Sequence, residues 1–323
     1  MRLQVAYAKT TGRRLARRVH AGSDTSVCGL HHVREKGDTY YLCGRANAPL
    51  TVVFIHGFML ESAAWYLQDD FLEANYPEIQ RLLIDVRGHG LAAGTPPQQC
   101  TIDGAADDVV AAINKAVPHG KIILVGHSLG GMITMNVVRR GGLGERIAGV
   151  VLCSTAIESF REDGVPQLLS LDAARRVHNA MQLAPHETQR LRDAAANLVA
   201  PAIAASVFQA RSTSGELVQF HADLAHAAPL STIIGYFHDL ATHNELAAAP
   251  WLDKYPGMIL VGSSDIVTPE KQSIRIDQMW NQGRLHVVPG VGHMLPLEGA
   301  SALNGALGEL ITTVEINHRH PEL

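Results

Sequence analysis

The sequence has few of the features that mark several common classes of protein. Its 323 residues include 4 cysteines, at positions 28, 43, 100 and 153, with no CxxC spacing. This is too few for a disulfide-stabilised secreted domain, so we expect free thiols in a reducing cytoplasm. No apolar run approaches the roughly 18 to 20 residues of a membrane-spanning helix, and the first residues lack the apolar centre of a secretion signal. We therefore expect a globular, cytoplasmic protein.

An excess of positive charge is also absent. The formal net charge is −4 and the pI is about 6.5, which argues against nucleic acid as a partner, because phosphate binding needs a basic face. The exception is a basic N-terminal extension, residues 1–25, which carries several arginines and no acid before Asp24. We predict a helix that is solvated or packed on the domain, and contact with a membrane surface or plain disorder are the less favoured alternatives. No feature of the sequence specifies an oligomeric state.

Residues 121–131 have the pattern of a strand, a sharp turn and a helix. An apolar, β-branched run at 121–125 is followed by Gly126-His127-Ser128-Leu129-Gly130, the pattern Gly-x-Ser-x-Gly, and then by a helical stretch. The two glycines allow the turn to hold Ser128 in strained backbone angles with its hydroxyl exposed. Because the helix begins directly behind the serine, we expect the backbone N–H of Leu129 to face negative charge that forms there.

Strand-like and helix-like segments alternate on both sides of this turn. Helices are predicted at 63–72, 102–116 and 301–314, and strands at 50–55, 81–85, 147–153, 258–262 and 284–288. A hairpin of strands 26–35 and 39–44 precedes them, and a frayed polar tail, 317–323, follows. The alternation is typical of an α/β fold with a doubly wound, mostly parallel sheet, formed here by residues 26–154 and 247–316. Ligands of such sheets bind at the carboxyl ends of the strands.

Two more polar residues are expected at that edge. Asp265 comes just after the strand at 258–262, where an acid is able to reach a histidine on the next loop. His293 comes after the strand at 284–288 and a Gly-x-Gly turn, with room to swing over Ser128. The carboxyl ends of the strands therefore offer a hydroxyl, an imidazole and a carboxylate.

These landmarks resemble the serine-dependent α/β-hydrolase family over roughly residues 26–314. Ser128, Asp265 and His293 follow the chain order of that family's catalytic triad, and the turn at Ser128 resembles its nucleophile elbow. The resemblance implies that Phe58, which follows His56-Gly57, donates a second backbone N–H to the oxyanion hole beside Leu129. It also implies a structural role for the bend Asp85-Val86-Arg87-Gly88-His89-Gly90.

Residues 155–246 depart from the alternation. No strand is predicted there, and the segment is rich in alanine and interrupted by prolines, with helices expected at 172–181, 187–199, 202–211, 215–226 and 232–244. It resembles the helical cap that many members of the family carry, and its apolar side chains favour an apolar acyl or alkyl group. His221 and His226 are five residues apart, as are His238 and His243, so neither pair shares a helical face and no metal site is predicted.

The predicted chemistry is nucleophilic and needs no cofactor. His293 would take the proton of Ser128 as the oxygen attacks a carbonyl, while Asp265 orients the imidazole. The leading interpretation is a carboxylesterase or lipase-like enzyme for a small or medium lipophilic ester. A thioesterase, a carbon–carbon bond hydrolase in which Arg211 binds a second carboxylate, a cofactor-free perhydrolase and a non-catalytic ligand-binding receptor remain alternatives.

Overall fold

A seven-stranded sheet forms the centre of the molecule. The structure is a computed structural model that describes residues 39–159, 207–209 and 213–319. The strands lie in the order β1-β3-β2-β4-β5-β6-β7, and only β1 runs antiparallel to its neighbour, β3. Their bounds are β1 Tyr40–Cys43, β2 Leu50–Ile55, β3 Gln80–Ile84, β4 Lys121–His127, β5 Ile147–Cys153, β6 Gly257–Gly262 and β7 Gly283–Val288. The predicted mostly parallel α/β sheet is confirmed.

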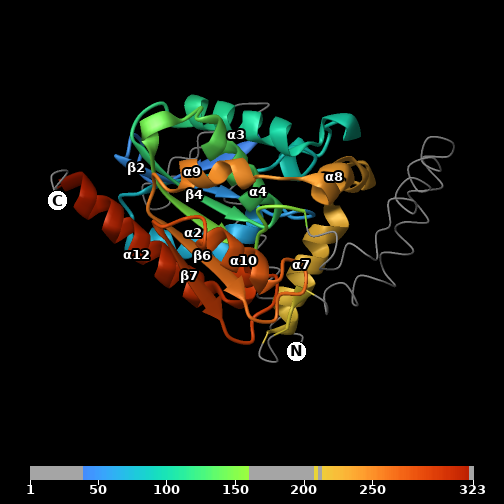
Figure 1. The fold of residues 1–323 in the computed structure, drawn as a ribbon. Coiled ribbons are helices and arrows are strands. Elements are labelled where there is room, and N and C mark those ends of the chain that lie inside the picture. The colour runs from blue at the N-terminus through green and yellow to red at the C-terminus, as the bar shows by residue number, and fades with distance from the viewer. Residues whose placement is uncertain (1–38, 160–206, 210–212, 320–323) are drawn as a thin grey trace.

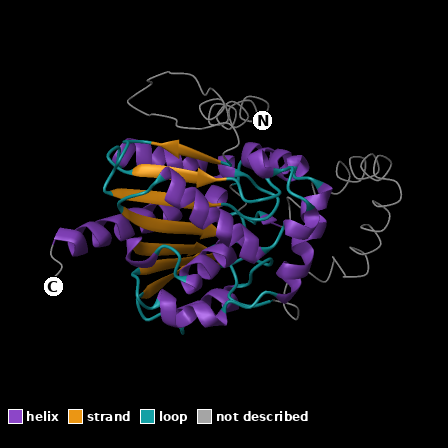
Figure 2. Ribbon diagram, turned by 90° about the horizontal axis from the view of Figure 1, so that it is seen from above, coloured by secondary structure: helices purple, strands orange, loops and turns teal. Residues whose placement is uncertain are grey.

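Helices cover both faces of the sheet, as Figures 1 and 2 show. On one face pack α3 (Ile102–Ala116), α4 (Leu129–Arg140), α9 (Ala249–Leu252) and α10 (Glu270–Asp277), through Val109, Ile133, Leu252 and Ile276. On the other face pack α2 (Tyr66–Asn75) and α12 (Ala300–Arg319), through Leu72, Leu303 and Leu307. Because both faces are covered, the central strands are continuous apolar runs, and all six residues of β2 are buried.

Two further helices lie beyond the carboxyl ends of the strands. They are α7 (Gly215–Ala227) and α8 (Leu230–Thr242), close to the predicted 215–226 and 232–244. Phe220 and Leu224 of α7 join a separate apolar cluster with Leu60 and Met294 of the core. In α8, Thr232 Oγ1 donates a hydrogen bond of 2.6 Å to the carbonyl of Gly88. The helices predicted at 172–181 and 187–199 lie outside the described residues. The helix predicted at 202–211 is described only at 207–209, and it is wrong at its end, because Phe208 and Gln209 are not helical. The cap boundaries stay a prediction.

The predictions for the two ends of the chain have different outcomes. The hairpin is described only from its second strand, β1, since 26–35 and the basic extension lie outside the described residues. The frayed tail is wrong at its start, because α12 continues to Arg319. The polar residues after Val314 do not end a helix by themselves, and the first helix-breaking residue is Pro321.

Two further predictions concerned free cysteine thiols and membrane-spanning segments. Cys43, Cys100 and Cys153 are buried free thiols, and Cys28 lies outside the described residues. Among the described helices, none combines the length and the apolar character that crossing a membrane would require.

Candidate active site

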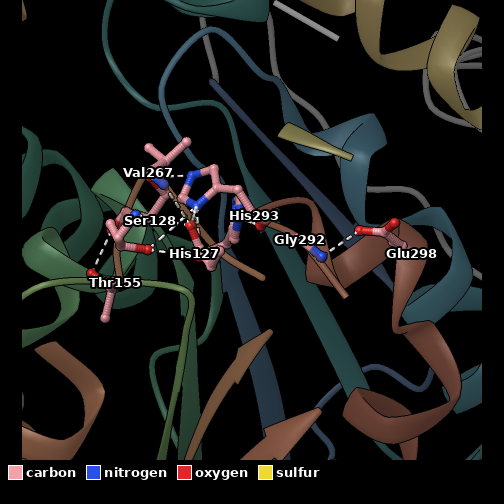
Figure 3. Close-up of polar contacts among 9 residues, drawn as sticks. His127, Ser128, Thr155, Val267, Gly292, His293 and Glu298 are labelled. Atoms are coloured by element: carbon pink, nitrogen blue, oxygen red, sulfur yellow. Dashed lines mark hydrogen bonds and ion pairs between the residues drawn. The ribbon is translucent and has the colours of Figure 1, made fainter. Parts of the chain in front are cut away.

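The turn between β4 and α4 holds Ser128 in a backbone conformation that residues other than glycine rarely adopt, with φ +52° and ψ −119°. The flanking glycines make this possible. A Cβ at Gly126 would collide with the carbonyl of Gly130, and a Cβ at Gly130 would collide with the carbonyl of Ile55. Thr155 Oγ1 also donates a hydrogen bond of 2.7 Å to the carbonyl of Ser128 (Figure 3). The strained angles are therefore stabilised by close packing on several sides.

The structure brings Ser128, His293 and Asp265 together. His293 Nε2 lies 3.1 Å from Ser128 Oγ (Figure 3). His293 Nδ1 lies 3.0 Å from Asp265 Oδ2. A carboxylate only accepts hydrogen bonds, so Nδ1 carries the proton and Nε2 is left to accept from the serine hydroxyl. All three side chains are buried, which strengthens each interaction by excluding water. This arrangement can move a proton from the serine to the imidazole.

Asp265 is surrounded by donors. The backbone N–H groups of Val267 and Thr268 each donate to Oδ1 at 2.9 Å, and Thr268 Oγ1 donates to Oδ2 at 2.9 Å. Burial alone would raise the pKa of Asp265, but the charge and hydrogen bond of His293 and the hydrogen bonds of Thr268 lower it overall. The carboxylate therefore stays ionised. Sequence reasoning did not single out Thr268, although a threonine three residues after an aspartate is a common turn pattern.

The backbone around His293 is held from three directions. His127 Nε2 donates to the carbonyl of His293 at 3.0 Å, and the N–H of His293 donates to the carbonyl of Val207 at 2.9 Å. Glu298 Oε2 accepts from the N–H of Gly292 at 2.6 Å (Figure 3). Burial and the neighbouring His293 lower the pKa of His127 to about 3, so it stays neutral. His127, Val207 and Glu298 fix the loop of His293 without touching the serine hydroxyl.

The two predicted oxyanion donors flank Ser128. Leu129 is the first residue of α4, and Phe58 follows Gly57, whose added Cβ would lie 3.1 Å from the Cβ of Ser128. Within the residues that the structure describes, neither the N–H of Leu129 nor that of Phe58 donates a hydrogen bond. Both amides are thus unused by the fold, and their role in binding an oxyanion stays a prediction.

Two neutral histidines support the loop that carries Phe58. His56 Nε2 accepts from the N–H of Val86 at 3.0 Å and Nδ1 donates to the carbonyl of Gly57 at 2.8 Å. His89 Nε2 accepts from the N–H of Met59 at 3.1 Å. Burial lowers the pKa of His56 to about 4, and burial together with His56 lowers that of His89 to about 3. Both imidazoles therefore act as uncharged hydrogen-bonding groups that hold this loop in place.

The structure also contains a cavity of about 220 Å³. It sits where the continuation of the Phe58 loop, the loop after β3 and the end of α7 meet, and its lining includes Tyr41, Glu61, Asp85, Leu91, Leu224 and Ala228. Burial and the adjacent Asp85 raise the pKa of Glu61 to about 7. No residue of the Ser128–His293–Asp265 cluster lines this cavity, so it is separate from the hydroxyl–imidazole–carboxylate chain.

A group of acidic side chains that could hold a metal ion lies on α2, outside the Ser128–His293–Asp265 cluster. In the described ranges, the group of acids close enough to share a metal ion is Asp69, Asp70 and Glu73 on α2, and Asp69 Oδ1 already accepts from Arg81 at 2.5 Å. Arg211, the residue considered for a second substrate carboxylate, lies outside the described residues.

Comparisons with known proteins agree with the fold. Residues 52–306 match the model of the Alpha/beta hydrolase family. The chain is 25% identical over 268 residues, 82% of its length, to the dihydrolipoyllysine-residue acetyltransferase component of the acetoin cleaving system of Pseudomonas putida, and spans 64% of that protein. It is 22% identical to the (E)-2-((N-methylformamido)methylene)succinate hydrolase of Acinetobacter baylyi, over 81% of this chain and 90% of that protein. A thermophilic esterase from Thermogutta terrifontis superposes with a TM-score of 0.66 at 22% identity, covering 91% of this chain and 97% of the esterase.

Proposed function

The chain belongs to the alpha/beta hydrolase family, and on this premise we propose that it is a serine hydrolase that cleaves carboxylic esters with lipophilic small or medium acyl or alkyl groups. The observation that carries the proposal is the chain of contacts from Ser128 Oγ to His293 Nε2 at 3.1 Å and from His293 Nδ1 to Asp265 Oδ2 at 3.0 Å. These distances suit proton transfer at the moment of attack.

In the proposed mechanism, Ser128 Oγ attacks the ester carbonyl carbon while His293 Nε2 takes its proton. Asp265 stabilises the imidazolium, and the N–H groups of Leu129 and Phe58 bind the developing oxyanion. His293 then protonates the departing alcohol, which leaves an acyl group on Ser128. Water repeats the sequence on this acyl-enzyme and releases the acid. Every proton moves between Ser128, His293, the alcohol and water, so the mechanism requires no cofactor.

The lipophilic substrate class is supported by the surroundings of the loops. Phe208, Phe220 and Leu224 pack with Leu60 and Met294 in one apolar cluster between α7 and the core. Such side chains favour apolar groups over charged ones, because a charge loses its hydration there. The small-molecule ester and the cytoplasmic location, which the free thiols support, belong to this proposal.

The experiment compares wild-type protein with Ser128→Ala. We expect a fluorophosphonate probe to label the wild type alone, and p-nitrophenyl esters to be hydrolysed with a kcat that falls by about 10⁴ to 10⁶ in the variant. A series of acyl chain lengths then separates the classes: rates that fall beyond about four carbons indicate an esterase, and rates that rise with length indicate a lipase.

Other outcomes would contradict the proposal. Absence of both labelling and turnover favours the ligand-binding receptor. If Ser128 is labelled but no oxygen ester is hydrolysed, turnover of a thioester favours a thioesterase and turnover of a vinylogous diketone favours a carbon–carbon bond hydrolase. Peroxide-dependent formation of a peracid favours a perhydrolase.

A further inference from the structure

A histidine of α7 packs against the segment that holds the imidazole that we propose as the base. The side chain of His221 is buried, with 7% of its surface exposed. Its ring contacts that of Phe208 edge to face, with centroids 5.3 Å apart. Phe208 directly follows Val207, whose carbonyl accepts from the N–H groups of His293 and Met294 at 2.9 and 3.2 Å. His221 therefore packs against the segment that holds the loop of His293.

His221 also interacts electrostatically with both histidines on the opposite side of the site. The charge of His293 contributes to the lowered pKa of His221, and His221 contributes to the lowered pKa of His127. Such interactions are screened less between buried groups than between exposed ones. The rings of His127 and His293 lie 5.1 Å apart between centroids, and the contact of His221 with Phe208 brings α7 against the segment that binds the loop of His293.

His221 differs from the other buried histidines of the site in its hydrogen bonds. His56, His89, His127 and His293 each use at least one ring nitrogen in a bond to the protein. Within the described part of the chain, the buried Nδ1 of His221 has no hydrogen-bond partner. The buried Nδ1 of His127 also lacks a partner, but its Nε2 is used by the fold, whereas the described ranges contain no hydrogen bond to either ring nitrogen of His221. A buried polar atom without a partner costs about 1 to 3 kcal/mol, so His221 would gain from a ligand that supplies one.

The imidazole is uncharged at neutral pH. Burial, followed by the charge of His293, lowers the pKa of His221 to about 4. A neutral imidazole offers one donor and one acceptor, which suits a hydroxyl group or a carbonyl oxygen. A carboxylate could accept only one hydrogen bond from the neutral ring, and its charge would lose its hydration among Phe208, Phe220 and Leu224.

We propose that His221 is a specificity-determining residue that hydrogen-bonds an uncharged oxygen function of the substrate, a hydroxyl or carbonyl lying outside the scissile ester. This rests on the proposed ester hydrolysis and narrows its substrate class to esters that are lipophilic but carry one neutral polar group. His221 takes no part in the proton transfers of Ser128 and His293.

The test uses matched esters of one size. Ethyl butyrate is the plain ester, ethyl 3-hydroxybutyrate carries the hydroxyl on the acyl side, and 2-hydroxyethyl butyrate carries it on the alcohol side; monoethyl succinate adds a carboxylate. We expect the wild type to prefer one hydroxylated ester over ethyl butyrate by about tenfold in kcat/KM, the value of one buried hydrogen bond. Monoethyl succinate is expected to be the poorest substrate.

Variants of α7 then assign the preference. In His221→Leu the ratio of hydroxylated to plain ester should fall close to one, mainly through KM, and His221→Gln, which keeps hydrogen-bonding atoms, should retain part of it. His226→Leu is the matched control, because His226 lies on the same helix and is exposed; its ratio should equal that of the wild type.

Several results would overturn the inference. They are equal kcat/KM for plain and hydroxylated esters in the wild type, a preference that survives in His221→Leu, and a preference for monoethyl succinate. If no ester is hydrolysed, the proposed function fails, and ligand-observed NMR titration of the Ser128→Ala variant with the same esters decides the inference separately. Tighter binding of a hydroxylated ester that is lost on adding His221→Leu supports it, and equal binding overturns it.

Discussion

Two buried aspartates at the same edge of the sheet differ in the direction of their pKa shifts. Asp265 follows β6 and Asp85 follows β3, with 6% and 3% of their surfaces exposed. The pKa of Asp265 is lowered, because His293 and Thr268 outweigh burial. The pKa of Asp85 is raised, because burial outweighs the backbone N–H groups of Leu91 and Ser62. Burial is thus common to both regions, and the side chains facing each carboxylate decide its chemistry.

The neighbours of Asp85 explain its different role. Its Oδ1 accepts from the N–H of Ser62 at 2.7 Å and its Oδ2 from the N–H of Leu91 at 2.9 Å. It therefore joins the segment after the Phe58 loop to the glycine-rich bend, in the structural role expected from the sequence. Among the residues that the structure describes, no imidazole is hydrogen-bonded to Asp85 as His293 is to Asp265, although His89 contributes a favourable charge interaction.

The largest expected effect comes from exchanging each carboxylate for an amide. Asp265→Asn should lower kcat for a p-nitrophenyl ester by about 10⁴, because the amide no longer selects the Nδ1–H tautomer of His293. Asp85→Asn should change kcat by less than about tenfold and lower the melting temperature instead. Steady-state kinetics and thermal melts of both variants give the comparison. Similar losses of kcat in the two would show that the regions are not distinct in function.

The next effect concerns the pH dependence of stability around Asp85. The pKa of Glu61 is raised to about 7, so the folded protein binds the proton of Glu61 more tightly than the unfolded chain does. Its stability contribution is therefore full at acidic pH and is lost as the pH rises from the unfolded value towards 7. Glu61→Gln should remove this loss and gain on the order of 2 kcal/mol at pH 8 relative to pH 5.

Urea unfolding at several pH values measures this difference. Glu78→Gln, at an exposed glutamate, is the control, and its stability should follow that of the wild type across the range. A Glu61→Gln curve parallel to the wild type would mean that the charge of Glu61 is not penalised by folding.

The smallest effect sharpens the account of Asp265. Thr268→Val removes the hydroxyl that donates to Oδ2 and should lower kcat/KM by about tenfold, the cost of one hydrogen bond to a charged group. Because Thr268 helps to lower the pKa of Asp265, that pKa should rise in the variant, which NMR titration of the carboxyl carbon measures. Thr268→Ser keeps the hydroxyl and should restore both properties. An unchanged pKa of Asp265 in Thr268→Val would limit the threonine to packing.

The sequence predicted the elements that depend on local patterns. The turn at Ser128 follows from the local pattern of residues 121–131. Helix α3 begins and ends where predicted, at Ile102 and Ala116, and Thr101 Oγ1 caps its start by accepting from the N–H of Gly104. Asp265 and His293 were found because each follows a strand whose pattern is clear.

What the sequence did not predict depends on contacts between distant segments. The bond from His127 to the carbonyl of His293 joins residues 166 positions apart, and no spacing rule encodes it. The spacing of the histidines at 221, 226, 238 and 243 shows only whether a pair shares a helical face. It carries no information on the contact of His221 with Phe208 or on its interaction with His293. The antiparallel pairing of β1 with β3 is likewise set by packing at the sheet edge.

The bond from His293 to the carbonyl of Val207 has a consequence for engineering. Gly292 allows this close approach, since an added Cβ there would lie 2.6 Å from that carbonyl oxygen, and Glu298 also accepts from the N–H of Gln209 at 2.9 Å. Anyone who grafts the 155–246 segment of another hydrolase onto this scaffold would also replace the backbone that steadies the base. A chimera would need an acceptor at position 207 and a donor at 209, and without them altered substrate choice would come with a slower catalyst.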